Sequence, residues 1–104
     1  MTGPTRVKVC GLTVPDEARR CAELGAWGIG AILSPVGPRR LAADRAAALF
    51  AAVPEGVARI GVFVDAGPAQ MRELAASCGL THVQVHGDVD PAEARRVVGL
   101  PVIE

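Results

Sequence analysis

Ala58–Val64 reads ARIGVFV, a stretch that is apolar except for Arg59. A strand with one face in water alternates between apolar and polar residues, and this stretch does not alternate. A short, continuous apolar run is typical of a parallel strand that is covered on both faces. We therefore predict a strand over these seven residues, within a parallel sheet.

Similar segments recur on both sides of this run. Strands are predicted at Arg6–Cys10, Trp27–Leu33 and Thr81–His86, and the closing letters LPVIE resemble the start of a fifth strand. Helix-like segments separate them: Pro15–Leu24, LAADRAAALFAAV, GPAQMRELAASCG, and a fourth that opens at Asp90-Pro91 with an N-cap followed by proline. Strand starts that recur about every 20–30 residues are expected for successive βα units.

Two architectures satisfy this pattern. Helices that alternate between the faces of a parallel sheet give a small doubly wound domain. Helices that all lie on one face require the sheet to close, as in a (β/α)8 TIM barrel, which needs about 200 residues or more. The 104 residues therefore indicate one α/β unit, spanning 1–104, that is either a doubly wound domain or about half of a barrel.

Composition excludes several classes of function. Half of the residues are hydrophobic, which argues against a disordered chain, and the formal net charge is zero, which gives no reason to expect nucleic acid as a partner. The apolar runs are short and the first residues lack a signal core, so we expect no membrane association and a cytoplasmic location. Cys10, Cys21 and Cys78 have neither disulfide-framework nor metal-ligand spacing, and we expect no metal and no cofactor.

The carboxyl ends of parallel strands carry the functional site in either architecture. Cys10, Asp65 and His86 stand at or just beyond three of these predicted ends, and Arg39 and Arg40 follow the second strand. A thiol beside arginines suits an anionic substrate and proton transfer, because a nearby cation such as Lys8 or Arg39 promotes ionisation of the thiol. We therefore expect the chemistry at this rim.

Four segments, in order, carry a resemblance to a known family. KVCGLTVPDEA resembles the K-[IV]-C-G-[LI]-T opening of phosphoribosylanthranilate isomerases, and AELGAWGIGAILSPVGPRRL is similar to their second strand and the S-P-R loop after it. IGVFVD and LTHVQVHGD resemble the third-strand pattern and the L-D-x-V-Q-L-H-G-D segment. The resemblance implies a partial (β/α)8 TIM barrel, with about four βα units and the start of a fifth strand.

The family reaction that this resemblance implies belongs to tryptophan biosynthesis. It is the Amadori rearrangement of N-(5-phosphoribosyl)anthranilate, a phosphorylated sugar-anthranilate, to a 1-amino-1-deoxyribulose 5-phosphate. The family cysteine, here Cys10, is the base that removes the C2′ proton, and the S-P-R arginine aligns with Arg39. Gly37 replaces the usual serine of that loop, which leaves Arg40 as an alternative to Arg39.

The resemblance also places parts of the family site outside these residues. The general-acid aspartate follows strand six, and the main phosphate loops follow strands seven and eight. We therefore expect a truncated isomerase that is weak or inactive alone. The alternative is a non-catalytic half-barrel remnant or assembly module. A half-barrel would bare the apolar inner face of its sheet, which predicts a homodimer through that open face.

Strand alternation assigns further residues. Lys8 points away from its valine neighbours and therefore inward, where it binds substrate or remains a solvated lysine. Gln84 and His86 share a face, and we assign both to substrate binding, with a plain polar rim as the alternative. Asp65 either belongs to the rim or caps the helix at Pro68. His82 is expected at the surface, and Cys21 and Cys78 in helix packing.

Overall fold

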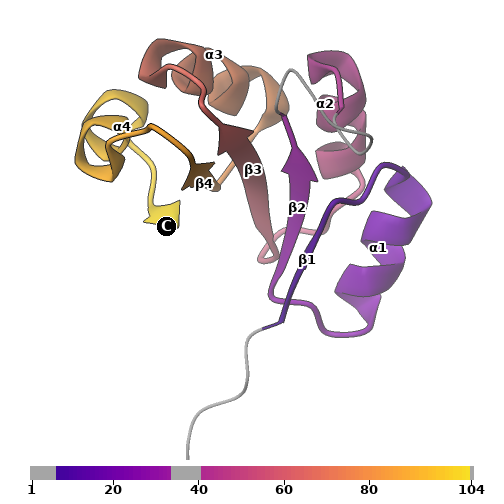
Figure 1. Cartoon of the computed structure of the whole chain (residues 1–104). Helices are drawn as coiled ribbons and strands as arrows, with labels where there is room; N and C mark the ends of the chain where they lie inside the picture. Colours follow the sequence, from indigo (N-terminus) through magenta and orange to yellow (C-terminus); the bar gives the residue numbers. More distant parts are fainter. Residues whose placement is uncertain (1–6, 34–40, 104) are drawn as a thin grey trace, which may run out of the picture.

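The computed structural model describes residues 7–33 and 41–103. Strands and helices alternate along the chain in the order β1 (Lys8–Cys10), α1 (Pro15–Glu23), β2 (Gly28–Ile32), α2 (Ala43–Ala51), β3 (Ala58–Val64), α3 (Pro68–Cys78), β4 (His82–His86), α4 (Pro91–Val98) and β5 (Val102–Ile103) (Figure 1).

The five strands form one parallel sheet in the order β1-β2-β3-β4-β5. In the register of the first three strands, Gly30 of β2 lies opposite Cys10 of β1 and Ile60 of β3. β3 occupies the predicted range residue for residue, and β2 and β4 lie within one residue of the predicted ends. β1 begins at Lys8 and ends at Cys10 as predicted, and Arg6, the predicted start of this strand, lies outside the described residues.

All four helices lie on one face of the sheet. α1 contacts α2, α2 contacts α3 and α3 contacts α4, so the helices form a single layer in chain order, as Figure 1 shows. Sequential parallel strands joined by crossovers of one hand place every helix on the same side. The doubly wound alternative is therefore wrong, and the chain forms part of a (β/α)8 barrel.

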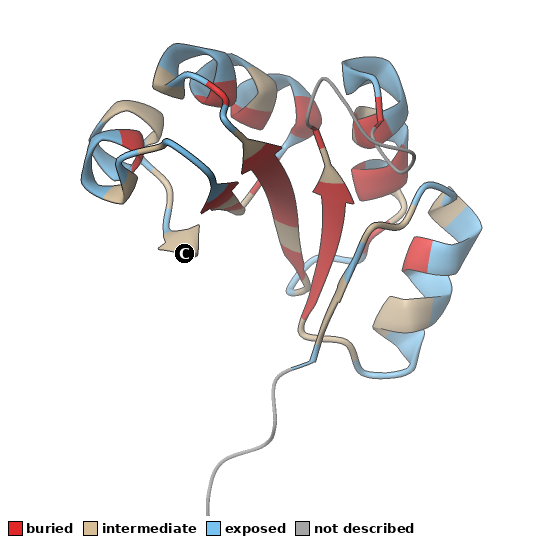
Figure 2. Ribbon diagram, viewed as in Figure 1, coloured by how far each residue is buried: buried red, intermediate tan, exposed pale blue. Residues whose placement is uncertain are grey.

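The main hydrophobic core lies between this helix layer and the sheet. Figure 2 shows buried residues along β2 and β3 and on the sheet-facing sides of the helices. Phe63, Ile29 and Val83 from the sheet are fully buried against Leu49 of α2 and Met71 of α3. Full burial of one such side chain stabilises a fold by about 1.5–3 kcal/mol, so this layer contributes substantially to the stability.

Local chemistry fixes where the helices begin and end. The Asp90 carboxylate accepts a hydrogen bond of 3.0 Å from the Ala92 N–H, which confirms the predicted N-cap of α4. Gly79 and Gly99 end α3 and α4 in the left-handed region, where a side chain would be strained. No helix within the described ranges is long and apolar enough to cross a membrane.

The inner face, which is the sheet face away from the helices, is less bare than expected. Ile60 has no exposed surface, and Ala58 and Val62 are 7% and 6% exposed. They pack in a second cluster with Trp27, Ile32 and Ile103. The expectation of a bare apolar inner face is therefore wrong for its centre, because the flanking strands and their side chains cover β3.

Candidate active site

Cys10 lies at the carboxyl end of β1 on the inner face. Its register partner is Gly30, whose own partner Ile60 belongs to the inner-face cluster, and side chains of paired residues in a parallel sheet share a face. The Cys10 thiol is free and exposed. An exposed thiol at this rim can reach a bound ligand, which a buried one could not.

Two glycines on β2 let neighbouring side chains of the inner face pack close to that strand. A Cβ on Gly30 would lie 3.2 Å from the Cys10 Sγ and 3.4 Å from its Cβ. A Cβ on Gly28, two residues before Gly30 on the same face, would meet the Ile60 side chain at 2.8 Å. Neither glycine was predicted as part of the site. Their spacing of two residues within a predicted strand, which places both on one face, could have indicated them.

Lys8 and Gln84 meet across the inner face. The Lys8 ammonium donates a hydrogen bond to the Gln84 Oε1, which joins β1 to β4. The Gln84 Nε2 lies 3.2 Å from the His86 Nε2. The structure therefore shows the predicted inward direction of Lys8 and the predicted common face of Gln84 and His86. Between described residues, no hydrogen bond joins the Lys8 ammonium to the Cys10 thiol.

Asp65 has a different role from the predicted helix cap. The N-cap of α3 is Gly67, and no side chain caps this helix. The Asp65 Oδ1 instead accepts a hydrogen bond of 2.8 Å from the Asp88 N–H, and the Asp65 N–H donates one of 3.1 Å to the His86 carbonyl. The cap prediction is wrong because a neighbouring loop offers its backbone donor to this carboxylate.

The arginines of the predicted site, Arg39 and Arg40, lie outside the described residues, as do Ser34 and Pro35. Their assignment to substrate binding stays a prediction. Within the described ranges no group of three His, Cys, Asp or Glu side chains is placed to hold a metal ion.

His82 is not the surface residue that the sequence predicted. Its ring stacks edge-on against Trp27, with ring centroids 5.3 Å apart, and its Nδ1 lies 2.8 Å from the Thr81 Oγ1. Burial lowers the pKa of His82 below its usual value. The prediction failed because Trp27, at the start of β2, lies beside His82 across the sheet. Cys78 is buried as expected, and burial raises the pKa of its thiol.

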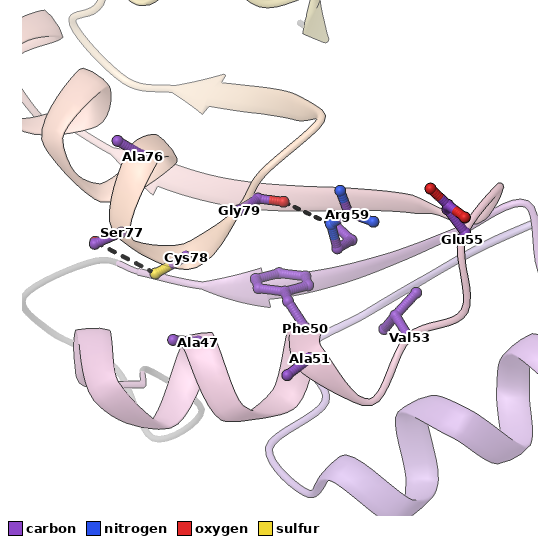
Figure 3. A pocket seen from close by; sticks show the side chains of 10 residues that line it. All are labelled: Ala47, Phe50, Ala51, Val53, Glu55, Arg59, Ala76, Ser77, Cys78 and Gly79. Atoms are coloured by element: carbon purple, nitrogen blue, oxygen red, sulfur yellow. Dashed lines mark hydrogen bonds between the residues drawn. The ribbon is translucent and has the colours of Figure 1, made fainter.

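A hollow among the described residues lies at the opposite end of the sheet. It has a volume of about 530 Å³ and is lined by residues of α2, of the end of α3 and of the start of β3 (Figure 3). Arg59 lies at its wall, where the Nε donates a hydrogen bond of 2.5 Å to the Gly79 carbonyl. Active sites of β/α barrels lie at the carboxyl ends of the strands, so we place the candidate site at Cys10 and not here.

Comparison with known proteins extends over almost the whole chain. A family model described as N-(5′-phosphoribosyl)anthranilate isomerase matches residues 7–104. An isomerase of that name from Syntrophomonas wolfei is 44% identical over 100 residues, which are 96% of this chain and 48% of the relative. One from Myxococcus xanthus is 44% identical over 99 residues, covering 95% and 46% of the two chains.

Solved structures give the same result. A phosphoribosylanthranilate isomerase from Thermus thermophilus matches with a TM-score of 0.86 at 37% identity, covering 94% of this chain and 50% of that one. The enzyme from Thermotoga maritima matches with a TM-score of 0.87 at 32% identity, covering 95% and 49%. The chain thus spans about half the length of the relatives that it matches. It belongs to the phosphoribosylanthranilate isomerase family.

Proposed function

We propose that these residues supply the base-bearing half of a phosphoribosylanthranilate isomerase site, with Cys10 as the general base. The exposed position of the Cys10 thiol, beside Gly30 at the carboxyl end of β1, is the observation that carries the proposal. An isomerase that converts an aldose-type sugar to a ketose needs a base close to C2′. A thiol at an open rim can be placed there.

The substrate of the proposed reaction is N-(5-phosphoribosyl)anthranilate. Once the sugar ring is open as an iminium, the Cys10 thiolate takes the C2′ proton and the resulting enolamine tautomerises to the ketone. Gly30 places no side chain against the Cys10 thiol, which a Cβ there would approach to 3.2 Å. We assign Lys8, Gln84, His86 and Arg39 to binding this anionic ligand, and a solved relative in complex with reduced 1-(O-carboxyphenylamino)-1-deoxyribulose 5-phosphate supports that ligand class.

Ring opening requires a proton donor at the ring oxygen. The family resemblance assigns that acid to an aspartate after a sixth strand, and the described residues form five strands. Loss of one acid or base commonly lowers a rate by about 10²–10⁴-fold. We therefore expect the 104-residue chain alone to be at least about 10²-fold slower than a full-length relative.

A chimera separates the base from the missing acid. The chain is joined to the C-terminal half of the Thermotoga maritima barrel, and turnover is followed by the fall in substrate fluorescence. We expect the chimera to be active and Cys10→Ala to lower kcat by about 10²–10⁴-fold with the fold retained.

Cys21→Ala is the matched control, because Cys21 is a half-buried thiol on α1 and not at the rim. We expect this control to stay within a few-fold of the parent. A Cys10→Ala chimera as active as the Cys21→Ala chimera would refute the assignment of the base.

Both the assembly and the location of the chain are also proposals. A relative from Thermotoga maritima is described as dimeric. β1 and β5 are the edges of the described sheet, and unpaired strand edges invite pairing with a second chain. We propose that two copies form a homodimer through the open face of the half-barrel and its strand edges. We also propose a cytoplasmic location, because tryptophan biosynthesis would require the enzyme there. Sedimentation at micromolar concentrations tests the dimer, and a monomer throughout would exclude it.

A further inference from the structure

A row of hydrogen bonds runs from Lys8 through Gln84 to His86. Each group in the row determines whether the next one donates or accepts. We infer that this row holds the His86 ring in the tautomer protonated on Nδ1, so that His86 offers an Nδ1–H donor to an oxygen of the ligand. Besides their proposed contacts with the ligand, Lys8 and Gln84 then act on the His86 ring as positioning residues. The inference deepens the proposed isomerase function and rests on it for the identity of the ligand.

The direction begins at Lys8. A lysine ammonium carries three donors and no acceptor, so only an acceptor can face it. The group that faces it is the amide of Gln84, through Oε1. The orientation of this amide is therefore set by the cation, because the flipped amide would bring an NH2 group against an ammonium.

The second step passes from Gln84 to His86. With Oε1 turned to Lys8, the other end of the Gln84 amide is an NH2 group, which can only donate. Its partner at 3.2 Å is the His86 Nε2, which must accept and therefore carries no proton. A neutral imidazole has one protonated nitrogen, so the proton resides on Nδ1.

Backbone contacts hold His86 in place for its hydrogen bond with Gln84. His86 pairs with Val64 in the sheet, and the Asp65 N–H donates a hydrogen bond of 3.1 Å to its carbonyl. Two residues later the Asp88 N–H is bonded to the Asp65 carboxylate. The His86 backbone is thus fixed on both sides, and its ring orientation is left to Gln84.

This arrangement suits a site that binds an anionic sugar. An unrestrained imidazole in water favours the Nε2–H tautomer, so the row selects the less common form. The Lys8 charge polarises the Gln84 amide, and hydrogen bonds in a chain strengthen one another. His86 can then donate from Nδ1 without carrying a charge of its own.

Nitrogen-15 NMR of the free chain tests the inference without substrate. In histidine-labelled protein at about pH 8, where an ordinary histidine is neutral, long-range proton–nitrogen correlations identify the protonated ring nitrogen. The signals of His82 are assigned by their loss in His82→Gln. We expect the Nδ1–H to Nε2–H ratio at His86 to exceed that of an unrestrained histidine by about 5-fold, the factor that one ordinary hydrogen bond supplies.

Gln84→Glu supplies the decisive variant. A carboxylate accepts at both oxygens, so it keeps Lys8 and can bond His86 only if the ring donates from Nε2. We expect the ratio at His86 to invert. Lys8→Met should move the ratio towards that of free imidazole, because the amide is then free to flip, and Lys8→Arg should restore it.

Two outcomes would overturn the inference. One is a parent protein whose His86 ratio equals that of an unrestrained histidine. The other is a His86 ratio unchanged in both Gln84→Glu and Lys8→Met, in proteins whose amide spectra show an intact fold. Neither outcome depends on turnover, so an inactive chimera would count against the proposed function and leave this inference standing.

Discussion

The Asp65 carboxylate accepts a hydrogen bond of 2.8 Å from the backbone N–H of Asp88, which ties the loop after β3 to the loop after β4. Asp65 itself has a positive φ of 53°, a region that few residues other than glycine, asparagine and aspartate adopt. The contact holds the chain immediately beyond His86, so it stabilises the rim where the candidate site lies.

Asp65→Ala should destabilise the chain, because alanine lacks the acceptor and is strained at positive φ. We expect the free energy of unfolding to fall by about 1–2 kcal/mol. Asp65→Asn keeps an acceptor and tolerates this backbone conformation, so its loss should stay below about 0.5 kcal/mol. Urea unfolding of the three proteins measures the difference. Equal losses in the two variants would show that the Asp88 contact contributes nothing.

Gly87→Ala should be more damaging than an ordinary loop substitution. Gly87 has a φ of 82°, and a Cβ there would overlap the Asp65 Oδ1. We expect a loss of about 1–3 kcal/mol from backbone strain and from the displaced carboxylate. Gly56→Ala is the control, since its φ of 93° is similar but a Cβ would meet nothing within 4 Å. A loss at position 87 no greater than at position 56 would contradict this account.

The three cysteines should react with a thiol reagent in a fixed order. Cys10 is exposed, Cys21 is half-buried and Cys78 is buried, with burial raising the pKa of the Cys78 thiol. Both lower exposure and a raised pKa slow a reaction that proceeds through the thiolate. Timed alkylation followed by peptide mass spectrometry should find Cys10 modified first and Cys78 last. Early modification of Cys78 under native conditions would show that α3 does not pack as described.

His82 should make stability depend on pH. Burial lowers its pKa in the folded chain, so at acidic pH the unfolded chain binds more protons than the folded chain does. The contribution of His82 is fully present above the unfolded value of about 6.5 and is lost as pH falls through the lower folded value. His82→Gln should flatten the fall in unfolding free energy below about pH 6.5. Parallel curves for parent and variant would refute this.

Patterns local in sequence predicted much of the architecture. The apolar run at Ala58–Val64 predicted both ends of β3 correctly, because the length of a strand and its burial on both faces determine which consecutive residues are apolar. Alternation placed Lys8, Gln84 and His86 on one face. The repeated βα pattern did not distinguish a doubly wound sheet from a barrel, because both use the same local units. The family resemblance favoured the barrel.

Contacts between distant segments were not predictable in this way. Lys8 and Gln84 are 76 residues apart, and nothing near either residue indicates its partner. Asp65 looked like a helix cap because an aspartate before Gly-Pro commonly is one, yet a backbone donor from the next loop was available. The covered centre of the inner face depends likewise on side chains from several strands, so the half-barrel architecture alone suggested a barer surface than the fold has.

The strand order has a consequence for how the chain folds. Within the described sheet, strands that are consecutive in sequence are hydrogen-bonded to one another, and each helix after α1 packs on its predecessor. Each new βα unit therefore packs on the unit before it. The contacts that it makes are separated by about one unit in sequence, so the entropic cost of closing each loop is small. A ribosome that releases the chain from its amino end would deliver these units in the order in which they pair, so folding can begin during synthesis.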